Sequence, residues 1–279
     1  MKIKLFTTAI LLCSFIINAQ NFTGKAIYKT HKKIDLKLGG EKSTMSGSQQ
    51  EQIEAQMKKM FQKTYILNFS KNESIYKEDV KLNAPKPQAG GVNMIAFGNG
   101  GGSDIYYKNI KEKRYVNKTE VMGKRFLVKD KLPSYSWVLS PETKNIGNYT
   151  CYKATFSKEV ENKKITFIDG ESVEETKKEI VVTTVWYTPQ VSVSNGPGNY
   201  QGLPGLILEI NDGKKTIVCT EIILNSVKQL VIEEPKKGKV VSQKKYTEIQ
   251  KQKSDEMMKK LQGRKGFDLG NGLNIKFGG

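Results

Sequence analysis

Short runs of β-branched and aromatic residues, each bounded by turn-forming residues, recur along most of this sequence. Runs of this length and spacing are typical of antiparallel sheets. The runs that we expect to form strands are Phe22–Thr30, Thr64–Ser70, Ser74–Asp79, Asp104–Asn109, Lys113–Val121, Lys124–Asp130, Tyr149–Ser157, Lys163–Ile168, Glu179–Tyr187, Gly205–Ile210 and Thr216–Leu224. The pattern therefore predicts a mainly β protein with an antiparallel, curved or half-barrel-like sheet.

Two segments have helical periodicity instead. Residues 48–62 carry apolar side chains at i, i+4, i+7 and i+8 from Ile53, after a capping box that starts at Ser48. Residues 243–262 carry a looser apolar stripe that Lys253 interrupts. We expect one inserted helix and one peripheral, basic, amphipathic helix near the C-terminus.

The N-terminus has the order of a secretory signal peptide. Lys2 and Lys4 precede the apolar run Leu5–Ile17, and Ala19 supplies a small residue for cleavage. The run is 13 residues long, whereas a membrane-spanning helix needs roughly 20. We expect cleavage near Ala19, a periplasmic or secreted location, and no transmembrane span in the mature chain.

The remaining chain shows no repeat and no clear linker between two halves. We expect a single β-rich domain over residues 20–242, a helix over 243–262 and a Gly-rich tail over 263–279. The tail and the Gly/Pro-rich loop 84–102 hold too few apolar residues to offset the entropy cost of ordering them. Both are therefore predicted to be mobile.

The charge is strongly positive, with 46 Lys and Arg against 28 Asp and Glu and a formal net charge of +18. Such a chain attracts acidic partners. Export makes nucleic acid a poor partner, and few aromatic residues lie among the lysines of residues 228–265. The basic run is either a solvated helix surface or a contact for an anionic envelope surface or an outer-membrane protein.

Cleavage near Ala19 would leave two cysteines, Cys151 and Cys219. An even number in an exported chain favours a disulfide between them. The alternative is two buried thiols that act as small apolar side chains. Cys151 alternates with Lys153 and Thr155 on one strand face, which weakens the disulfide prediction.

Few residues suit catalysis or metal binding. The single histidine, His31, cannot form a multi-histidine metal site, and its lysine neighbours disfavour its charged form. No metalloprotease or nucleophile-elbow motif is present. We expect no metal and no cofactor. Glu209 and Asp212 remain candidates for an acid–base pair in a hydrolase.

The segment that follows Trp186 is the most distinctive. A predicted strand ends at an aromatic pair, and glycines and prolines then fix a specific chain path, because Gly permits positive φ and Pro locks φ. The residues that we single out as a binding or structural signature are Trp186, Tyr187, Pro189, Gly196, Pro197, Gly202, Leu203, Pro204 and Gly205. Gly/Pro patterns more often specify a path than a chemical site.

Two hairpin turns are predicted. Met122-Gly123 is expected to form a tight turn, and Asp212-Gly213 a two-residue type I′ turn. The second turn would set the register of its strands. It would place Ile210 opposite Lys215, Leu208 opposite Ile217, and Leu206 opposite Cys219.

Residues 202–207 spell GLPGLI. The other residues that carry the resemblance are Trp137, Glu142-Thr143-Lys144-Asn145-Ile146-Gly147, Tyr149, Cys151, Lys153-Ala154, Trp186-Tyr187-Thr188-Pro189 and Gly196-Pro197. From Phe22 to Pro235 the chain resembles the GLPGLI family of exported Bacteroidetes proteins. The resemblance implies export and a β-rich fold, and it implies no particular activity.

Three functions are compatible with these features. The first is a non-catalytic envelope protein that binds a hydrophobic ligand, or an outer-membrane or periplasmic partner, through its sheet. The second is a hydrolase that uses Asp and Glu at a cleft near residues 202–207. The third is an accessory module of an outer-membrane receptor. The sequence favours a protein without catalytic activity.

Overall fold

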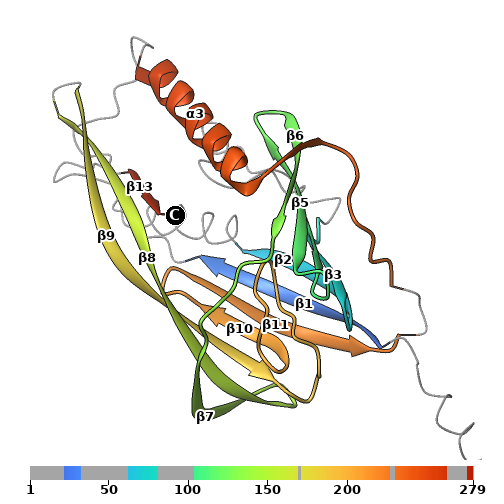
Figure 1. Ribbon diagram of the computed structural model, residues 1–279. Coiled ribbons are helices and arrows are strands. Elements are labelled where there is room, and N and C mark those ends of the chain that lie inside the picture. Colours follow the sequence, from blue (N-terminus) through green and yellow to red (C-terminus); the bar gives the residue numbers. More distant parts are fainter. Residues whose placement is uncertain are drawn as a thin grey trace, which may run out of the picture.

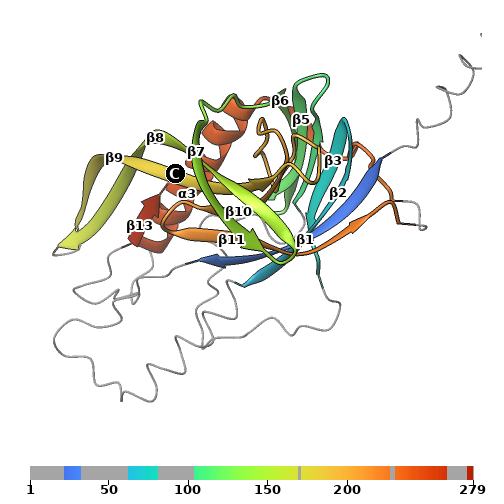
Figure 2. The ribbon, with the colours of Figure 1, turned by 90° about the horizontal axis from the view of Figure 1, so that it is seen from below.

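A computed structural model describes residues 22–32, 62–80, 104–168, 171–226, 230–262 and 275–278. The predicted signal peptide, residues 48–61 of the predicted inserted helix and the loop 84–102 lie outside these residues. All thirteen described strands belong to one sheet. Figures 1 and 2 show this sheet curving into an open half-barrel. The predicted mainly β, antiparallel fold is confirmed.

The strands are β1 (Thr23–Lys32), β2 (Lys63–Ser70), β3 (Glu73–Glu78), β4 (Ile105–Asn109), β5 (Arg114–Val121), β6 (Lys124–Lys131), β7 (Val138–Ile146), β8 (Tyr149–Ile168), β9 (Glu171–Thr188), β10 (Leu206–Asn211), β11 (Lys215–Leu224), β12 (Lys239–Val241) and β13 (Ile275–Gly278). Their order is β12-β6-β5-β4-β3-β2-β1-β11-β10-β9-β8-β13, and β7 pairs with β8. Only the β12–β6 pair is parallel. The helix α3 spans Gln243–Gln262, as predicted.

The strands β8 and β9 differ most from expectation. They form one continuous hairpin, paired from Tyr152↔Tyr187 to Ile168↔Glu171, where the sequence suggested interrupted strands. The charged residues that hid this continuity face each other across the hairpin, as the 2.8 Å ion pair between Lys178 and Glu159 shows. Sequence reasoning also missed β7, β12 and β13, the last within the predicted mobile tail.

Residues that pair across strands share one face of a sheet. On the face that we call the inner face, three cross-strand rows of side chains run over β2 to β6. Row 1 consists of Phe69, Ser74, Lys108, Tyr115 and Asp130. Row 2 consists of Leu67, Tyr76, Tyr106, Asn117 and Val128. Row 3 consists of Tyr65, Glu78, Thr119 and Phe126.

The helix α3 packs on the outermost strands of these rows. Ser242 caps its N-terminus by accepting a 3.2 Å hydrogen bond from the Lys245 amide. Tyr246 is buried, meets the Phe126 ring edge-on at 5.9 Å and lies 3.0 Å from the Thr119 hydroxyl. Most other α3 side chains described are exposed, so the helix is peripheral, and only its first turns are anchored.

The predicted tight turn between β5 and β6 is present. Met122 and Gly123 have φ of 47° and 78°, the two positive values of a type I′ turn. The β10–β11 turn lies one residue later than predicted and is centred on Gly213 and Lys214. The reason is that the Asp212 carboxylate accepts hydrogen bonds from the amides of Lys214 and Lys215. The predicted register is therefore wrong.

Ile210 faces Ile217 rather than Lys215, since moving the turn centre by one residue changes every pair. The expectation that Cys219 lies on an apolar face nevertheless agrees with its buried position in the core.

The predicted disulfide is not formed in the structure: Cys151 and Cys219 are free, buried thiols. Cys151 lies on β8 and Cys219 on β11, with two strands between them in the sheet order, and both thiols belong to the same core cluster. The structure therefore corresponds to the alternative of two buried thiols that act as small apolar side chains.

Candidate functional site

The segment 189–205, which we call the signature loop, lies against row 1 of the inner face. The Lys108 ammonium donates to the carbonyls of Gly196 at 2.7 Å and Tyr200 at 2.9 Å. Immediately after the loop, the Ile207 carbonyl accepts a 2.8 Å hydrogen bond from the buried Tyr28 hydroxyl. The loop therefore covers one end of the curved sheet.

The glycines of the loop are required by close packing. A Cβ on Gly205 would lie 2.2 Å from the Thr188 carbonyl oxygen, and one on Gly196 would lie 2.9 Å from the Ile207 Cβ. Gly202 has a φ of +95°, a conformation that L-residues rarely adopt. These contacts support a structural role for the glycines.

The signature residues differ in exposure. Those buried are Tyr187, Gly196, Pro197, Leu203 and Gly205; those exposed are Pro189, Gly202 and Pro204; Trp186 is intermediate. Four aromatic rings, from Tyr135, Trp137, Phe156 and Tyr200, pack together beside the loop. The Trp137 indole donates a 3.0 Å hydrogen bond to the Gln201 carbonyl. The loop is thus held on both sides.

The two carboxylates proposed for hydrolysis have other partners. Glu209 forms a 2.8 Å ion pair with Lys144, whose ammonium also lies 4.5 Å from the centre of the Trp186 ring. Asp212 accepts hydrogen bonds from the amides of its own turn. Neither carboxylate faces a second one through these contacts, so the structure gives this pair no support as a catalytic dyad.

A buried lysine, which sequence reasoning missed, lies beneath the signature loop. Lys108 is fully buried, and burial lowers the pKa of its amine well below the usual value. Beside it, the Asn195 amide oxygen accepts from Ser74 at 3.2 Å and from the Gly196 amide at 2.8 Å. The Asn195 amide nitrogen is buried without a partner among the described residues.

The other end of the inner face is rich in tyrosine. The rings of Tyr65 and Tyr76 stack at 4.9 Å, Tyr28 meets Tyr76 edge-on at 6.2 Å, and Tyr106 stacks on Tyr115 at 5.0 Å. Tyr65, Tyr76 and Tyr106 are only partly buried. No hydrogen bond joins the hydroxyls of these three to any described part of the chain. We call this region the tyrosine face.

Two carboxylates border the tyrosine face. Glu78 forms a 2.8 Å ion pair with Lys63. Asp104 directly precedes β4, and burial raises the pKa of its carboxyl, although a hydrogen bond with Thr119 opposes this shift. Within the described ranges, Asp104 Oδ1 and Asn117 Oδ1 are buried without a hydrogen-bond partner. Buried polar atoms are seldom left unpaired, so both acceptors mark a site that water or a ligand completes.

Sequence reasoning did not find the tyrosine face, although its residues lie in predicted strands. Alternation places Ser74, Tyr76 and Glu78 on one face of β3. Nothing in the sequence shows that β3 lies between β2 and β4 in a register that stacks these side chains with Tyr65 and Tyr106. That information comes from the sheet topology alone.

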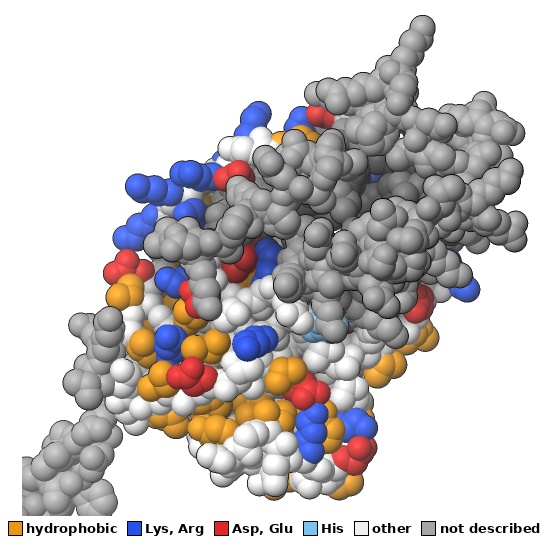
Figure 3. Space-filling view, turned by 180° about the vertical axis from the view of Figure 1, so that it is seen from behind, with side chains coloured by type: hydrophobic (Ala, Val, Ile, Leu, Met, Phe, Trp, Pro, Cys, Tyr) orange, Lys and Arg blue, Asp and Glu red, His pale blue; other side chains and the backbone are white. Residues whose placement is uncertain are grey.

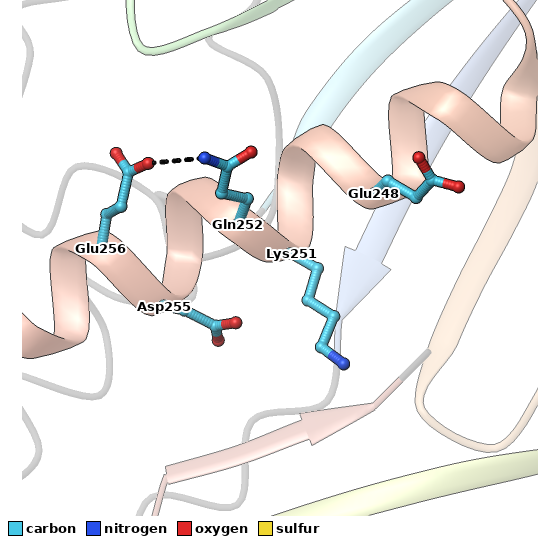
Figure 4. A pocket seen from close by; sticks show the side chains of 5 residues that line it. All are labelled: Glu248, Lys251, Gln252, Asp255 and Glu256. Carbon is cyan, nitrogen blue, oxygen red and sulfur yellow. Dashed lines mark hydrogen bonds between the residues drawn. The ribbon is translucent and has the colours of Figure 1, made fainter.

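Other surfaces are less suited to a small ligand. An open depression of about 450 Å³ beside α3 is lined by Glu248, Lys251, Gln252, Asp255 and Glu256 (Figure 4). All five residues belong to one helix, and Gln252 and Glu256 are hydrogen-bonded to each other at 3.1 Å. All five lining residues are polar or charged, whereas ligand sites are lined mainly by hydrophobic and aromatic side chains.

Basic side chains gather at one edge of the molecule. Figure 3 shows Lys and Arg side chains towards the upper left of the rear face, with apolar side chains over its lower part. Lys236, Lys237 and Lys239 are exposed. Contact with an anionic envelope surface stays a prediction. His31 is also exposed, opposite Thr216.

No helix in the described ranges combines the length and the hydrophobicity needed to cross a bilayer. Among the same residues, no three His, Cys, Asp or Glu side chains are grouped as metal ligands.

The chain is similar to one protein family and to solved structures. Residues 137–209 match a family described as "Protein of unknown function (Porph_ging)". The comparison with curated proteins found no match. Similar solved structures include PNGF-II in the C2 space group, with TM-score 0.47 and 13% identity, and in the P21 space group, with TM-score 0.46 and 12% identity. Both matches cover 83% of this chain and 33% of the other, so the chain spans about a third of PNGF-II.

Proposed function

We propose that this chain is an exported, non-catalytic envelope protein of the GLPGLI type that binds a largely hydrophobic organic ligand on the tyrosine face. The observation that carries the proposal is the coincidence of partly exposed tyrosine rings with buried, unpaired acceptors at Asp104 and Asn117. Aromatic side chains with a few placed polar atoms are the usual lining of a ligand site.

The energetics favour an occupant. A buried acceptor without a partner destabilises a fold by about 1–3 kcal/mol. Two of them border the tyrosine face, at Asn117 in row 2 and at Asp104 just before β4. A ligand that donates hydrogen bonds to them would recover that energy. The stacked rings beside them supply apolar area that the same ligand would remove from water.

The signature loop would act as the wall of this site rather than as its contact surface. It covers row 1 through Lys108 and Ser74, whereas Tyr65 and Glu78 lie two rows away. The loop would therefore confine a ligand to the tyrosine face and hold the curvature of the sheet.

Native mass spectrometry of protein purified from its own envelope tests this function. We expect a bound organic molecule that is lost in Tyr76→Ala and retained in Tyr152→Ala, because Tyr152 is a partly exposed tyrosine of β8 outside the tyrosine face. A protein that carries no ligand, and binds none from an extract of the same envelope, would overturn the proposal.

The long β8–β9 hairpin favours a second candidate, an accessory module that pairs with a strand of an outer-membrane protein. β10 pairs with β9 only over Thr184–Thr188, and along Lys177–Thr183 no other described strand joins that edge. Ile180 and Val182 are 69% and 52% exposed there. An open edge with apolar side chains is a template for strand addition.

Cross-linking in intact cells separates this candidate from the first. The double variant Ile180→Lys/Val182→Lys should lose a cross-linked partner, since charged edge residues block strand pairing. Val231→Lys is the matched control, because Val231 is equally exposed at a different place. If both variants keep the partner, β9 is not its binding edge.

A further inference from the structure

We propose that the ligand of the tyrosine face is an organic cation, recognised through an ammonium group that lies among Tyr65, Tyr76 and Tyr106 and contacts Asp104. This inference rests on the proposed binding function and adds the chemical class of the ligand. Three independent features of the inner face support it: the kind of unpaired atoms, the chemistry of the rings, and the local balance of charge.

The unpaired buried side-chain atoms of this region are acceptors. Asp104 Oδ1 and Asn117 Oδ1 both lack a donor among the described residues. An ammonium group only donates hydrogen bonds, so it matches these two open acceptors. A hydroxyl group could also donate to them, so the rings and the local charges are what favour a cation.

The rings have the electron distribution that cations prefer. Aromatic faces are negative, and a cation within about 6 Å of a ring centre gains about 0.5–2 kcal/mol per contact. The stacked pair of Tyr65 and Tyr76 and the neighbouring Tyr106 lie on adjacent strands, since Tyr76 pairs directly with Tyr106. Several rings next to one carboxylate form the arrangement that recognises ammonium groups.

The charges around the site sum to one excess negative group. The Lys63 ammonium pairs with Glu78 at 2.8 Å and also acts on the Asp104 carboxyl, so two acids share one cation. Lys108, in row 1, adds little opposing charge, because its burial favours the neutral amine. The strongly basic chain therefore has a locally acidic inner face.

The burial of Asp104 is consistent with a missing cation. Removal from water is the main cause that raises the pKa of its carboxyl; the Thr119 hydrogen bond and Lys63 oppose the shift, and Glu78 and Glu120 add to it. A cation held against Oδ1 would favour the charged form, as an opposite charge does at such short range.

Calorimetric titration with two probes of the same shape tests the inference. Choline carries a trimethylammonium group, and 3,3-dimethyl-1-butanol is its uncharged counterpart. We expect choline to bind at least about tenfold more tightly, a difference of about 1.4 kcal/mol. Asp104→Asn should remove that preference and leave the binding of the alcohol unchanged.

Glu120→Gln is the matched control. Glu120 lies next to Thr119 on β5, so it faces the opposite side of the sheet, where it pairs with Arg125. The variant should keep the preference for choline. Tyr106→Leu is a second test that leaves the carboxylate in place, and it should weaken choline more than the alcohol. Circular dichroism verifies that each variant is folded.

The results distinguish the two proposals. If choline and the alcohol bind equally, or Asp104→Asn and Glu120→Gln behave alike, the cation inference is overturned while binding on the tyrosine face stands. If neither probe binds and the purified protein holds no ligand, both proposals fail.

Discussion

At the scale of single residues, the approach of Gly205 to the end of β9 is the tightest contact of the signature loop. A side chain there would overlap the main chain at Thr188, which cannot move without breaking β9–β10 pairing. We therefore expect Gly205→Ala to lower the free energy of unfolding by about 4 kcal/mol or more, the range of severe core substitutions.

The matched control is Gly213→Ala, in open space at φ +85°, which should cost only about 1–2 kcal/mol of backbone strain. Urea unfolding measures both variants. Equal losses of stability would contradict the steric argument for Gly205.

Lys108 makes stability depend on pH. Its pKa is lowered in the folded state and close to 10.4 when unfolded. Between these values the unfolded chain binds a proton that the native protein does not, so stability rises with pH, by up to about 1.4 kcal/mol per unit. Lys108→Met should lose this rise between pH 7 and 9.5, whereas Lys111→Met, at an exposed turn, should keep it. Parallel pH profiles for wild type and Lys108→Met would disprove this account.

The cysteines should titrate as two thiols. Burial raises the pKa of Cys151 to about 11 and that of Cys219 to about 12, and the thiolate is the reactive form. Ellman's reagent should therefore react slowly with the native chain from Gln20 onward. It should detect two thiols per chain in denaturant without reductant, and detecting none would indicate a disulfide between them.

At the scale of elements, sequence reasoning succeeded where local chemistry decides. The helix α3 has the predicted position because an N-terminal cap and an apolar stripe act over a few residues. The Met122-Gly123 turn has the predicted position because it needs only two neighbouring residues with positive φ. It failed for the charged half of the β8–β9 hairpin, where each strand is stabilised by its partner. It also misplaced the β10–β11 turn by one residue, since the Asp212 side chain shifted the centre.

Tyr246 is the buried side chain through which α3 docks on the sheet. Tyr246→Ala removes the contact with Phe126 and the hydrogen bond with Thr119, so we expect a loss of about 3 kcal/mol. Tyr246→Phe removes only the hydrogen bond and should cost about 1 kcal/mol. Hydrogen exchange should show faster exchange across α3 in the alanine variant and unchanged exchange in β1 and β2. Unchanged exchange in α3 would mean that other contacts hold the helix.

At the scale of the whole molecule, the proposed export predicts a processed chain. In its native host the protein should be recovered outside the cytosol, with a mass that lacks about the first 19 residues. Leu11→Arg should leave the chain unprocessed, because a charge in the apolar run blocks its recognition as a signal peptide. Recovery of the full-length wild-type chain from the cytosol would contradict export.

The sequence by itself determined the fold class and most strand positions, because the alternation of side chains along a strand and the turn-forming residues are local properties. The tertiary structure decided which side chains meet. It buried Cys151 and Cys219 as free thiols, paired Glu209 with Lys144, buried Lys108, and brought Tyr65, Tyr76 and Tyr106 onto one face. The physical reason is that strand order and register set the contacts between residues far apart in the chain. The alternation of side chains along a strand, with a period of two residues, determines only the face on which each residue lies.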